Sequence, residues 1–169
     1  NFMKHILILF FLGSISNSQA QSFGNQVQNP LLIDAWYSSV AEADVDGDGD
    51  IDIFIAGKPT FSPTPVTKLY LNDGLGYFIE DAGSSFIGIQ SGSLAVADID
   101  GDGDQDLFVT GMTDSSNTPA SKLYLNDGTG SFSEDTSSTF SQVRWSAAAF
   151  ADIDGDNDPD LMITGVPSS

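Results

Sequence analysis

The sequence predicts an all-β fold made of repeated units of four antiparallel strands. Aspartate-rich segments begin at Asp44, Asp98 and Asp152, and each begins 54 residues after the one before. Between these segments lie short runs of β-branched and aromatic residues, separated by Gly, Asn, Asp and Pro, which is the pattern of strands and turns. No window after the first twenty residues shows a sustained helical period.

The first twenty residues are expected to be a secretion signal, residues 1–20, rather than part of the fold. A short basic start at Met3-Lys4-His5 is followed by an unbroken apolar stretch at 6–12 and by small residues around Ala20. Asn1 and Phe2 precede the expected start methionine. Because the apolar stretch is shorter than the roughly 20 residues that span a bilayer, we expect no membrane span in the mature chain and a secreted or cell-surface location.

The 54-residue step aligns much more of the chain than the acidic segments. Residues 68–74, Lys-Leu-Tyr-Leu-Asn-Asp-Gly, recur as 122–128, and Phe86 recurs as Phe140. Such self-similarity indicates stacked or radial repeats. We therefore divide the chain after the signal into an N-terminal lead-in (21–37), repeat 1 (38–91), repeat 2 (92–145) and a partial repeat 3 (146–169).

Within repeat 2 the pattern predicts four strands, at 93–97, 106–111, 122–125 and 131–134. The acidic segment joins the first strand to the second, a polar loop at 112–120 joins the second to the third, and an Asn-Asp-Gly turn joins the third to the fourth. Four short antiparallel strands per unit match one blade of a β-propeller. A closed propeller takes about four to eight blades, so we expect an incomplete, truncated propeller of about two and a half blades, with further blades in a longer chain.

Each acidic segment carries aspartate at alternate positions, which we number 1, 3, 5, 7 and 9 of a loop. Calcium takes six to eight oxygen ligands in flexible geometry. The carboxylates at positions 1, 3 and 5 can point at one centre, position 7 can give its backbone carbonyl, and position 9 closes the site. We therefore expect one Ca²⁺ in each loop, three in the chain. The candidate metal-binding residues are Asp44, Asp46, Asp48, Asp50, Asp52, Asp98, Asp100, Asp102, Asp104, Asp106, Asp152, Asp154, Asp156, Asp158 and Asp160.

Positions 4 and 6 of the loops require unusual backbone angles. Glycine occupies both positions in the first two loops and can adopt a left-handed conformation. In the third loop position 6 is Asn157, which tolerates that conformation better than most residues with a Cβ. Pro159 there removes one amide donor, so we expect the third site to be slightly weaker.

Other interpretations of the loops fit the sequence less well. A solvated loop without an ion would hold several carboxylates together against their mutual repulsion. An EF-hand needs flanking helices and a glutamate at position 12, where this chain has Ile55, Val109 and Ile163. A phosphate-binding loop is excluded because the interleaved aspartates would repel phosphate.

The loop and the hairpin that follows it resemble the FG-GAP/VCBS repeat family. The resemblance rests on the run from Ala97 to Val109 and on Leu-Tyr-Leu-Asn-Asp-Gly-x-Gly-x-Phe, and it covers roughly residues 36–169. It implies calcium-binding propeller repeats like those in the head of integrin α subunits, with the same assignment of ligands. The Phe-Gly pair of the motif falls on Trp36-Tyr37, Gln90-Ser91 and Arg144-Trp145. Its Gly-Ala-Pro part survives only in part, which places the chain nearer the VCBS side.

Composition narrows the possible functions. The chain has 24 acidic and 5 basic residues, for a net charge of −19, so nucleic acid and anionic membrane surfaces would repel it. It has no Cys, and its only His is His5 within the expected signal. Catalysis by Ser-His or Cys-His and the usual zinc sites are therefore excluded.

We therefore expect a secreted, non-catalytic, calcium-binding module for cell adhesion or for recognition of an extracellular protein or carbohydrate. The alternative is that these repeats are the propeller portion of a larger extracellular enzyme, such as a polysaccharide lyase or another hydrolase. The loop aspartates are committed to metal, and the remaining aspartates, such as Asp34 and Asp114, show no paired arrangement for acid and base catalysis.

The strand order predicts which loops share a face. The acidic loops and the Asn-Asp-Gly turns lie on one face, and the more variable loops, with Phe61, Arg144 and Trp145, lie on the other. Those variable residues either contact a partner, because binding sites commonly lie on variable loops, or pack one blade against the next. We expect six other apolar residues to belong to the core: Trp36, Tyr37, Leu69, Tyr70, Leu71 and Tyr124.

Overall fold

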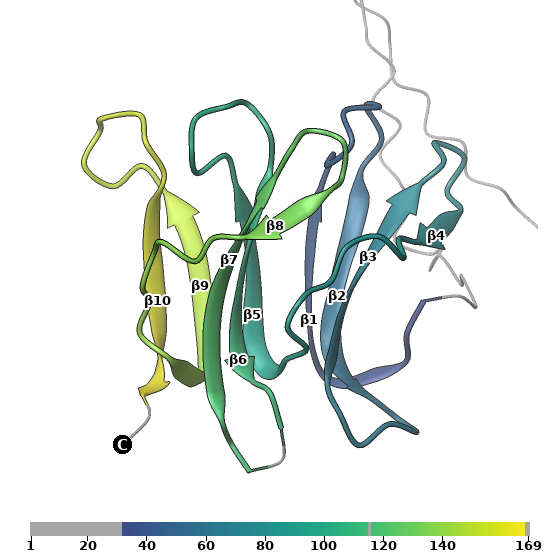
Figure 1. Cartoon of the computed structure of the whole chain (residues 1–169), viewed down its shortest axis with the longest axis vertical. Helices are drawn as coiled ribbons and strands as arrows, with labels where there is room; N and C mark the ends of the chain where they lie inside the picture. Colours follow the sequence, from purple (N-terminus) through teal and green to yellow (C-terminus); the bar gives the residue numbers. More distant parts are fainter. Residues whose placement is uncertain (1–31, 115, 168–169) are drawn as a thin grey trace, which may run out of the picture.

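The computed structural model describes residues 32–114 and 116–167, and over these residues the fold is all-β, as predicted (Figure 1). The expected signal at 1–20, and with it residues 21–31 of the lead-in, lie outside the described residues. The described part of the chain contains no helix long and apolar enough to cross a membrane. The strands are β1 (Ala35–Ala43), β2 (Asp52–Pro59), β3 (Val66–Asn72), β4 (Phe78–Glu80), β5 (Gln90–Ala97), β6 (Asp106–Met112), β7 (Pro119–Asn126), β8 (Phe132–Glu134), β9 (Val143–Ala151) and β10 (Asp160–Pro167).

The strands form three antiparallel sheets, one for each repeat. The first sheet has the order β1-β2-β3-β4, the second sheet has the order β5-β6-β7-β8, and the third sheet is the hairpin of β9 and β10. Each complete repeat therefore gives a four-stranded antiparallel sheet, as the sequence predicts. In the second sheet β5, β6 and β7 run slightly further than predicted, whereas β8 is one residue shorter. The three sheets of the described chain do not close into a ring (Figure 1).

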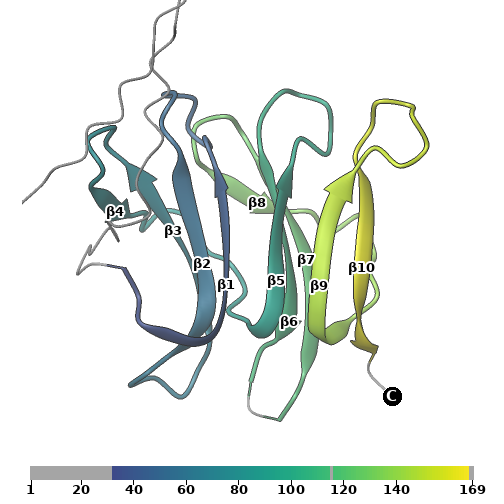
Figure 2. The same cartoon turned by 180° about the vertical axis from the view of Figure 1, so that it is seen from behind.

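The first strands of the three sheets, β1, β5 and β9, lie side by side (Figure 2). The backbone N–H of Leu94 donates a hydrogen bond to the hydroxyl of Ser39 at 3.1 Å. The hydroxyl of Ser93 donates to the carbonyl of Ala148 at 3.4 Å. These bonds cross from the first sheet to the second and from the second to the third. The inner strands β1, β5 and β9 therefore fix how the sheets stack.

Aromatic rings fill the space between the first and second sheets. Phe86, from the connector between β4 and β5, contacts Tyr124 and Phe132 edge-on, with ring centroids 5.2 and 5.3 Å apart. Phe54 contacts Phe86 and Phe132 at 5.7 and 5.6 Å. Edge-to-face geometry is a favoured arrangement of aromatic pairs. The connector therefore supplies a ring that joins two sheets, and Phe140 at the equivalent position contacts Phe108 at 5.0 Å.

The predicted core is confirmed in four of its six residues. Leu69, Tyr70 and Tyr124 are buried, and Leu71 is half-buried against the core. The prediction is wrong for Trp36 and Tyr37, which are 62% and 65% exposed. The pairing of β1 with β2 shifts register between Trp36 and Ser39, and Tyr37 has a φ of 53°. This bulge puts both aromatic side chains at the surface.

The segments that lead into β1 and β5 are each held by a tyrosine hydroxyl. Tyr124 accepts a hydrogen bond from the N–H of Ile87 at 2.7 Å, and Tyr70 accepts one from the N–H of Ile33 at 3.2 Å. Buried tyrosine hydroxyls commonly find such a partner. The Leu-Tyr-Leu strand of each repeat therefore contributes a ring to the core and a clamp for the chain that enters β5 or β1.

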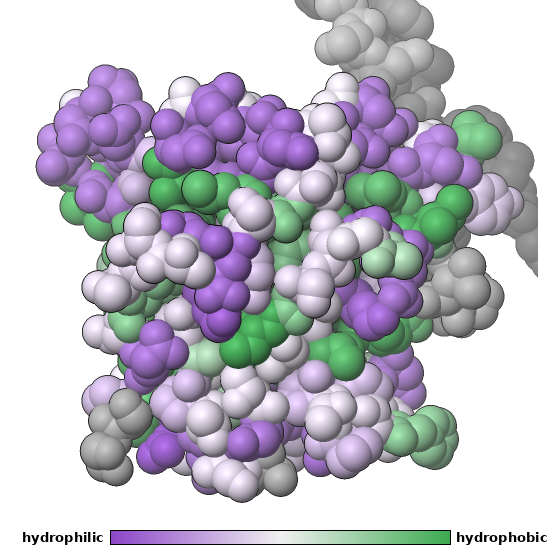
Figure 3. All heavy atoms as spheres, viewed as in Figure 1, coloured by the Kyte–Doolittle hydropathy of each residue, from purple (hydrophilic) through white to green (hydrophobic). Residues whose placement is uncertain are grey.

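The loops divide between two ends of the sheets, as the sequence predicts (Figure 1). The acidic end carries the three aspartate loops and the turns at 73–77 and 127–131. The opposite end carries residues 60–65, 113–114 and 116–118 and the beginnings of β1, β5 and β9. Hydrophilic residues gather along the acidic end (Figure 3).

Candidate metal centres

The aspartate at position 1 shapes each loop by accepting backbone hydrogen bonds. Asp44 accepts from the N–H groups of Gly47 at 2.9 Å and Gly49 at 3.0 Å. Asp98 makes the same two bonds in the second loop. Asp152 repeats the pattern in the third loop, with bonds to Gly155 at 2.7 Å and Asn157 at 3.2 Å. One carboxylate thus bends the backbone around itself in every loop.

The bend requires left-handed backbone at position 6. Gly49 and Gly103 have φ values of 94° and 99°, and Asn157 has a φ of 74°. The prediction that Asn157 adopts the left-handed conformation is therefore confirmed. A residue with a larger or branched side chain would be strained at this position.

Replacing Asn157 tests that requirement. We expect Asn157→Ala to lower the free energy of unfolding in saturating Ca²⁺ by about 1 kcal/mol, because alanine tolerates a left-handed backbone poorly. The free energy of unfolding of Asn157→Gly is expected to stay within about 0.5 kcal/mol of that of the original chain, since glycine adopts this backbone conformation without steric strain. Denaturant unfolding of the two variants measures the difference. Equal loss in both would mean that the side chain of Asn157, and not its backbone, matters.

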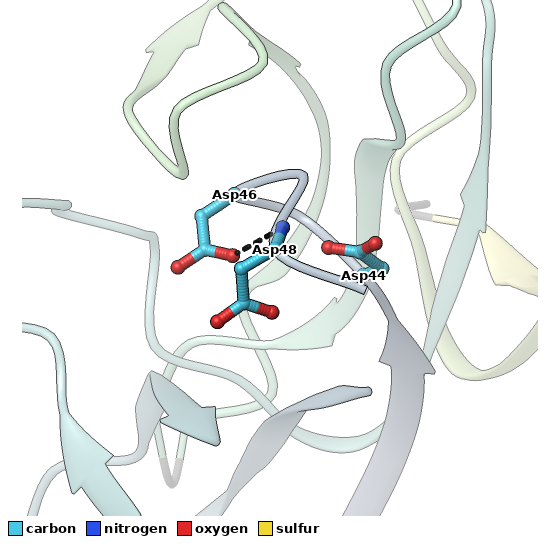
Figure 4. Close-up of side chains that lie close together, drawn as sticks. All are labelled: Asp44, Asp46 and Asp48. Atoms are coloured by element: carbon cyan, nitrogen blue, oxygen red, sulfur yellow. Dashed lines mark hydrogen bonds between the residues drawn. The ribbon is translucent and has the colours of Figure 1, made fainter. Parts of the chain in front are cut away.

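The carboxylates inside each loop lie close enough to share one cation. In the first loop, ligand atoms of Asp44, Asp46 and Asp48 lie within 4.8 Å of one another (Figure 4). Asp46 and Asp48 each use one oxygen to accept a backbone N–H, from Asp48 at 3.3 Å and from Asp50 at 2.9 Å. Their second oxygens make no hydrogen bond within the described chain and are free to face an ion. In the other two loops the groups within this distance combine positions 1 and 3 with position 9 instead of position 5: Asp98, Asp100 and Asp106, and Asp152, Asp154 and Asp160.

The aspartate at position 9 ties the loop to the sheet. Asp52 is buried, and its two oxygens accept the N–H of Val45 at 3.0 Å and of Asn72 at 2.8 Å. Asp106, 1% exposed, accepts the N–H of Ile99 at 2.8 Å and of Asn126 at 2.9 Å. Position 9 therefore links the beginning of the loop to the end of the third strand. The sequence indicated a metal ligand at position 9 but not these two hydrogen bonds from backbone N–H groups.

The aspartates at position 7, Asp50, Asp104 and Asp158, belong to none of the three carboxylate groups of the described chain. Partial desolvation, and then repulsion from Asp102 and other nearby carboxylates, raise the pKa of Asp104. The side chains of Asp50 and Asp104 lie against Gly74 and Gly128 of the neighbouring turns. This placement leaves the backbone carbonyl as the oxygen that position 7 could offer a metal.

Comparison with protein-family models identifies the repeat. The FG-GAP-like repeat matches residues 44–109 and again residues 98–163. The chain belongs to the FG-GAP-like repeat family. The two matches are offset by 54 residues, and each runs from one acidic loop into the strand that follows the next loop. Comparison with curated proteins found no match.

The FG-GAP-like repeats also contact one another at the acidic end. The side-chain amide of Asn126, in the second sheet, donates a hydrogen bond to the carbonyl of Val45 in the first loop at 2.8 Å. Gly130, in the turn after Asn126, lies beside Asp46 and Val45. The turn of one repeat therefore supports the loop of the repeat before it. Sequence reasoning assigned Asn126 only to a hairpin turn, although its recurrence from Asn72 was a signal of a further role.

The electrostatics and donor set of the FG-GAP-like loops fit a hard divalent cation. Burial raises the pKa of Asp52 and of Asp106, two backbone N–H groups lower it in each case, and nearby loop carboxylates raise it further. Every side chain in the three groups is a carboxylate. Oxygen donors alone suit Ca²⁺ or Mg²⁺ rather than zinc or copper. The residues present therefore fit a hard divalent cation, a class that includes Ca²⁺.

Proposed function

We propose that this chain is part of a secreted β-propeller of FG-GAP-like repeats in which each acidic loop binds one Ca²⁺, and that it serves adhesion or recognition rather than catalysis. The observation that supports this most strongly is the gathering of three carboxylates within 4.8 Å in each of three loops. The loops recur at one fixed step, and each begins with the same backbone bonds to its first aspartate.

The bound ion would have a structural role. Carboxylates at positions 1, 3, 5 and 9 and the carbonyl of position 7 would hold it, which falls within the range of six to eight oxygens when one carboxylate is bidentate or water takes part. The ion supplies positive charge. The chain itself supplies the shape, because position 1 bends the loop and position 9 fastens it to the third strand. Three divalent ions would cancel six of the negative charges.

Most of the acids outside the loops are occupied by structural bonds, which supports a non-catalytic role. Glu80 and Glu134 pair with Lys68 and Lys122. Asp135 accepts bonds from the backbone and side chain of Ser137. Others cap turns in the same way: Asp73, Asp81, Asp114 and Asp127. The FG-GAP-like repeat is itself a non-catalytic type of domain.

The calcium proposal is tested by titration calorimetry on chelator-treated protein. We expect saturable Ca²⁺ uptake at three sites in the unmodified chain and at two in Asp102→Ala, which removes a position 5 carboxylate from the second loop. Ser133→Ala, a change away from the loops, is the matched control and is expected to keep three sites. Absence of Ca²⁺ uptake by the folded protein would contradict the proposal.

A further inference from the structure

The basic side chains of this acidic protein are distributed unevenly. In the described part of the chain, Lys68 and Lys122 are neutralised by Glu80 and Glu134. The other two cations there, Lys58 and Arg144, form no ion pair with a described residue. Both lie at the opposite end from the acidic loops, one at the end of β2 and one at the beginning of β9. Unpaired positive charge is therefore concentrated on one end of a chain whose net charge is −19.

Lys58 lines a cleft built from all three sheets, and Arg144 contacts two of the residues that line it. The cleft has a volume of about 310 Å³ and brings together the beginnings of β1, β5 and β9. A second cleft of about 320 Å³ shares Tyr37 and Lys58 with the first. Residues lining the first cleft are Tyr37, Lys58, Gln90, Ser91, Met112, Asn117 and Trp145.

Arg144 is held beside the cleft by two contacts. Its guanidinium lies over the ring of Trp145, 5.1 Å from the centroid. One terminal nitrogen donates to the backbone carbonyl of Asn117 at 3.4 Å. A cation stacked on an aromatic face is favourably placed, and the guanidinium keeps further N–H groups for an acceptor.

The aromatic residues of the cleft are exposed on strained backbone. Tyr37 and Trp145 have φ values of 53° and 48°, and Ser91 at the equivalent position has 50°. A bulky residue in this region is an outlier, and such strain persists mostly at functional sites. Trp145 is 57% exposed, so its ring does not contribute a buried core contact that would offset the strain. The glycine of the Phe-Gly pair, which would relieve the strain, is absent at all three positions.

We propose that this cleft binds an acidic sugar, a uronic acid unit of an extracellular polysaccharide. The inference rests on the proposed recognition role and names the ligand class. Exposed rings of Tyr37 and Trp145 offer flat apolar surfaces for the C–H face of a pyranose. Lys58 in the lining and Arg144 beside it offer positive charge to its carboxylate, and the polar side chains in the lining offer partners to its hydroxyls. A small-molecule site typically has a small number of polar groups that point at the ligand from among aromatic and apolar side chains.

An acidic peptide is the competing ligand, and the cleft suits it less well. Peptides commonly bind by adding a strand to a free edge or by placing side chains in apolar pockets, and acidic motifs are bound by clusters of arginines. This cleft has one lysine in its lining and one arginine beside it. Here the rings are open to solvent, and the lining mixes amide, hydroxyl and ammonium groups with a single aliphatic residue, Met112. The arrangement favours a flat, hydroxyl-rich ligand.

Titration calorimetry with a galacturonic acid trisaccharide in saturating Ca²⁺ tests the inference. The full chain is expected to bind it saturably, and the carboxyl-reduced trisaccharide at least tenfold more weakly. Lys58→Gln is expected to weaken binding at least tenfold. Lys68→Gln, which removes the same charge from an ion pair elsewhere, is the matched control and is expected to leave binding unchanged.

The aromatic contribution is tested with Trp145→Gly. We expect binding to fall at least tenfold while the melting temperature is unchanged or higher, because glycine fits the left-handed backbone that tryptophan occupies under strain. Equal binding of the carboxyl-reduced sugar, equal binding of an oligoglutamate peptide, or equal loss in Lys68→Gln would overturn the inference. Lack of trisaccharide binding by a protein that Ca²⁺ still stabilises would overturn it too, and would leave the calcium proposal intact. Lack of any Ca²⁺ effect would instead overturn the proposed function.

Discussion

Removing Ca²⁺ with EDTA is expected to lower the melting temperature by about 8–16 °C. An extracellular site of millimolar affinity at tenfold saturation stabilises the folded chain by about 1.4 kcal/mol, so three sites together contribute about 4 kcal/mol. For a chain of this size each 1 kcal/mol shifts the melting temperature by about 2–4 °C. The chain has no cysteine, so disulfides contribute nothing to its stability.

The chelator experiment has an internal check in its dependence on salt. Without the ion, carboxylates such as Asp44, Asp46 and Asp48 lie within 4.8 Å of one another and repel. Added monovalent salt screens that repulsion and should raise the melting temperature of the EDTA-treated protein. It should have a smaller effect on the calcium-loaded protein. The same melting curve with EDTA as with Ca²⁺ would contradict a stabilising metal in the loops.

Much of the fold was predictable because each local sequence pattern occurs in more than one repeat. The same strand and turn residues recur 54 positions apart, so a pattern too short to interpret once is supported by its copy. The left-handed position at Asn157 was predictable for the same reason, since the two other loops have glycine there. What depends only on nearby residues, such as strands, turns and the bend of each loop, could be inferred from the sequence.

The burial of side chains could not be predicted so well, because it depends on which neighbouring sheets pack against each strand. Gln90 and Trp36 occupy equivalent positions, yet Gln90 is 6% exposed and Trp36 is 62% exposed. The second sheet has neighbours on both faces, so β6 is buried along its whole length. Strand β10 has a similar sequence but is largely exposed, since the described chain packs little against it. A strand pattern indicates which residues alternate, but not how many faces are covered.

The double role of position 9 was also beyond local reasoning. Asp106 accepts one hydrogen bond from within its own loop and another from Asn126, twenty residues further along the chain. Only the folded sheet brings the third strand to the loop. The sequence therefore indicated a carboxylate suited to metal, and the structure adds that the same carboxylate fastens two parts of the repeat.

Because Asp106 accepts these two hydrogen bonds, Asp106→Ala is the substitution with the largest expected effect, a loss of about 4 kcal/mol in the free energy of unfolding. Leaving the part-buried N–H of Ile99 and the buried N–H of Asn126 without an acceptor costs about 1–3 kcal/mol each. Loss of the second metal site adds about 1.4 kcal/mol when Ca²⁺ is present. Denaturant unfolding with and without EDTA measures both contributions.

Two matched variants separate the effect of these hydrogen bonds on stability from the effect of metal binding. Asp104→Ala, two residues earlier, removes a half-buried carboxylate at position 7, which offers a metal only its backbone carbonyl, and is expected to change the free energy of unfolding by less than about 1 kcal/mol. Asp102→Ala is expected to destabilise the calcium-loaded protein and to have little effect in EDTA, because its side chain only closes a local turn with Asp104. Asp106→Ala should still destabilise in EDTA, since its bonds to backbone N–H groups need no ion. If its effect disappeared in EDTA, Asp106 would be a ligand alone, and the loop would depend on the metal for its attachment to the sheet.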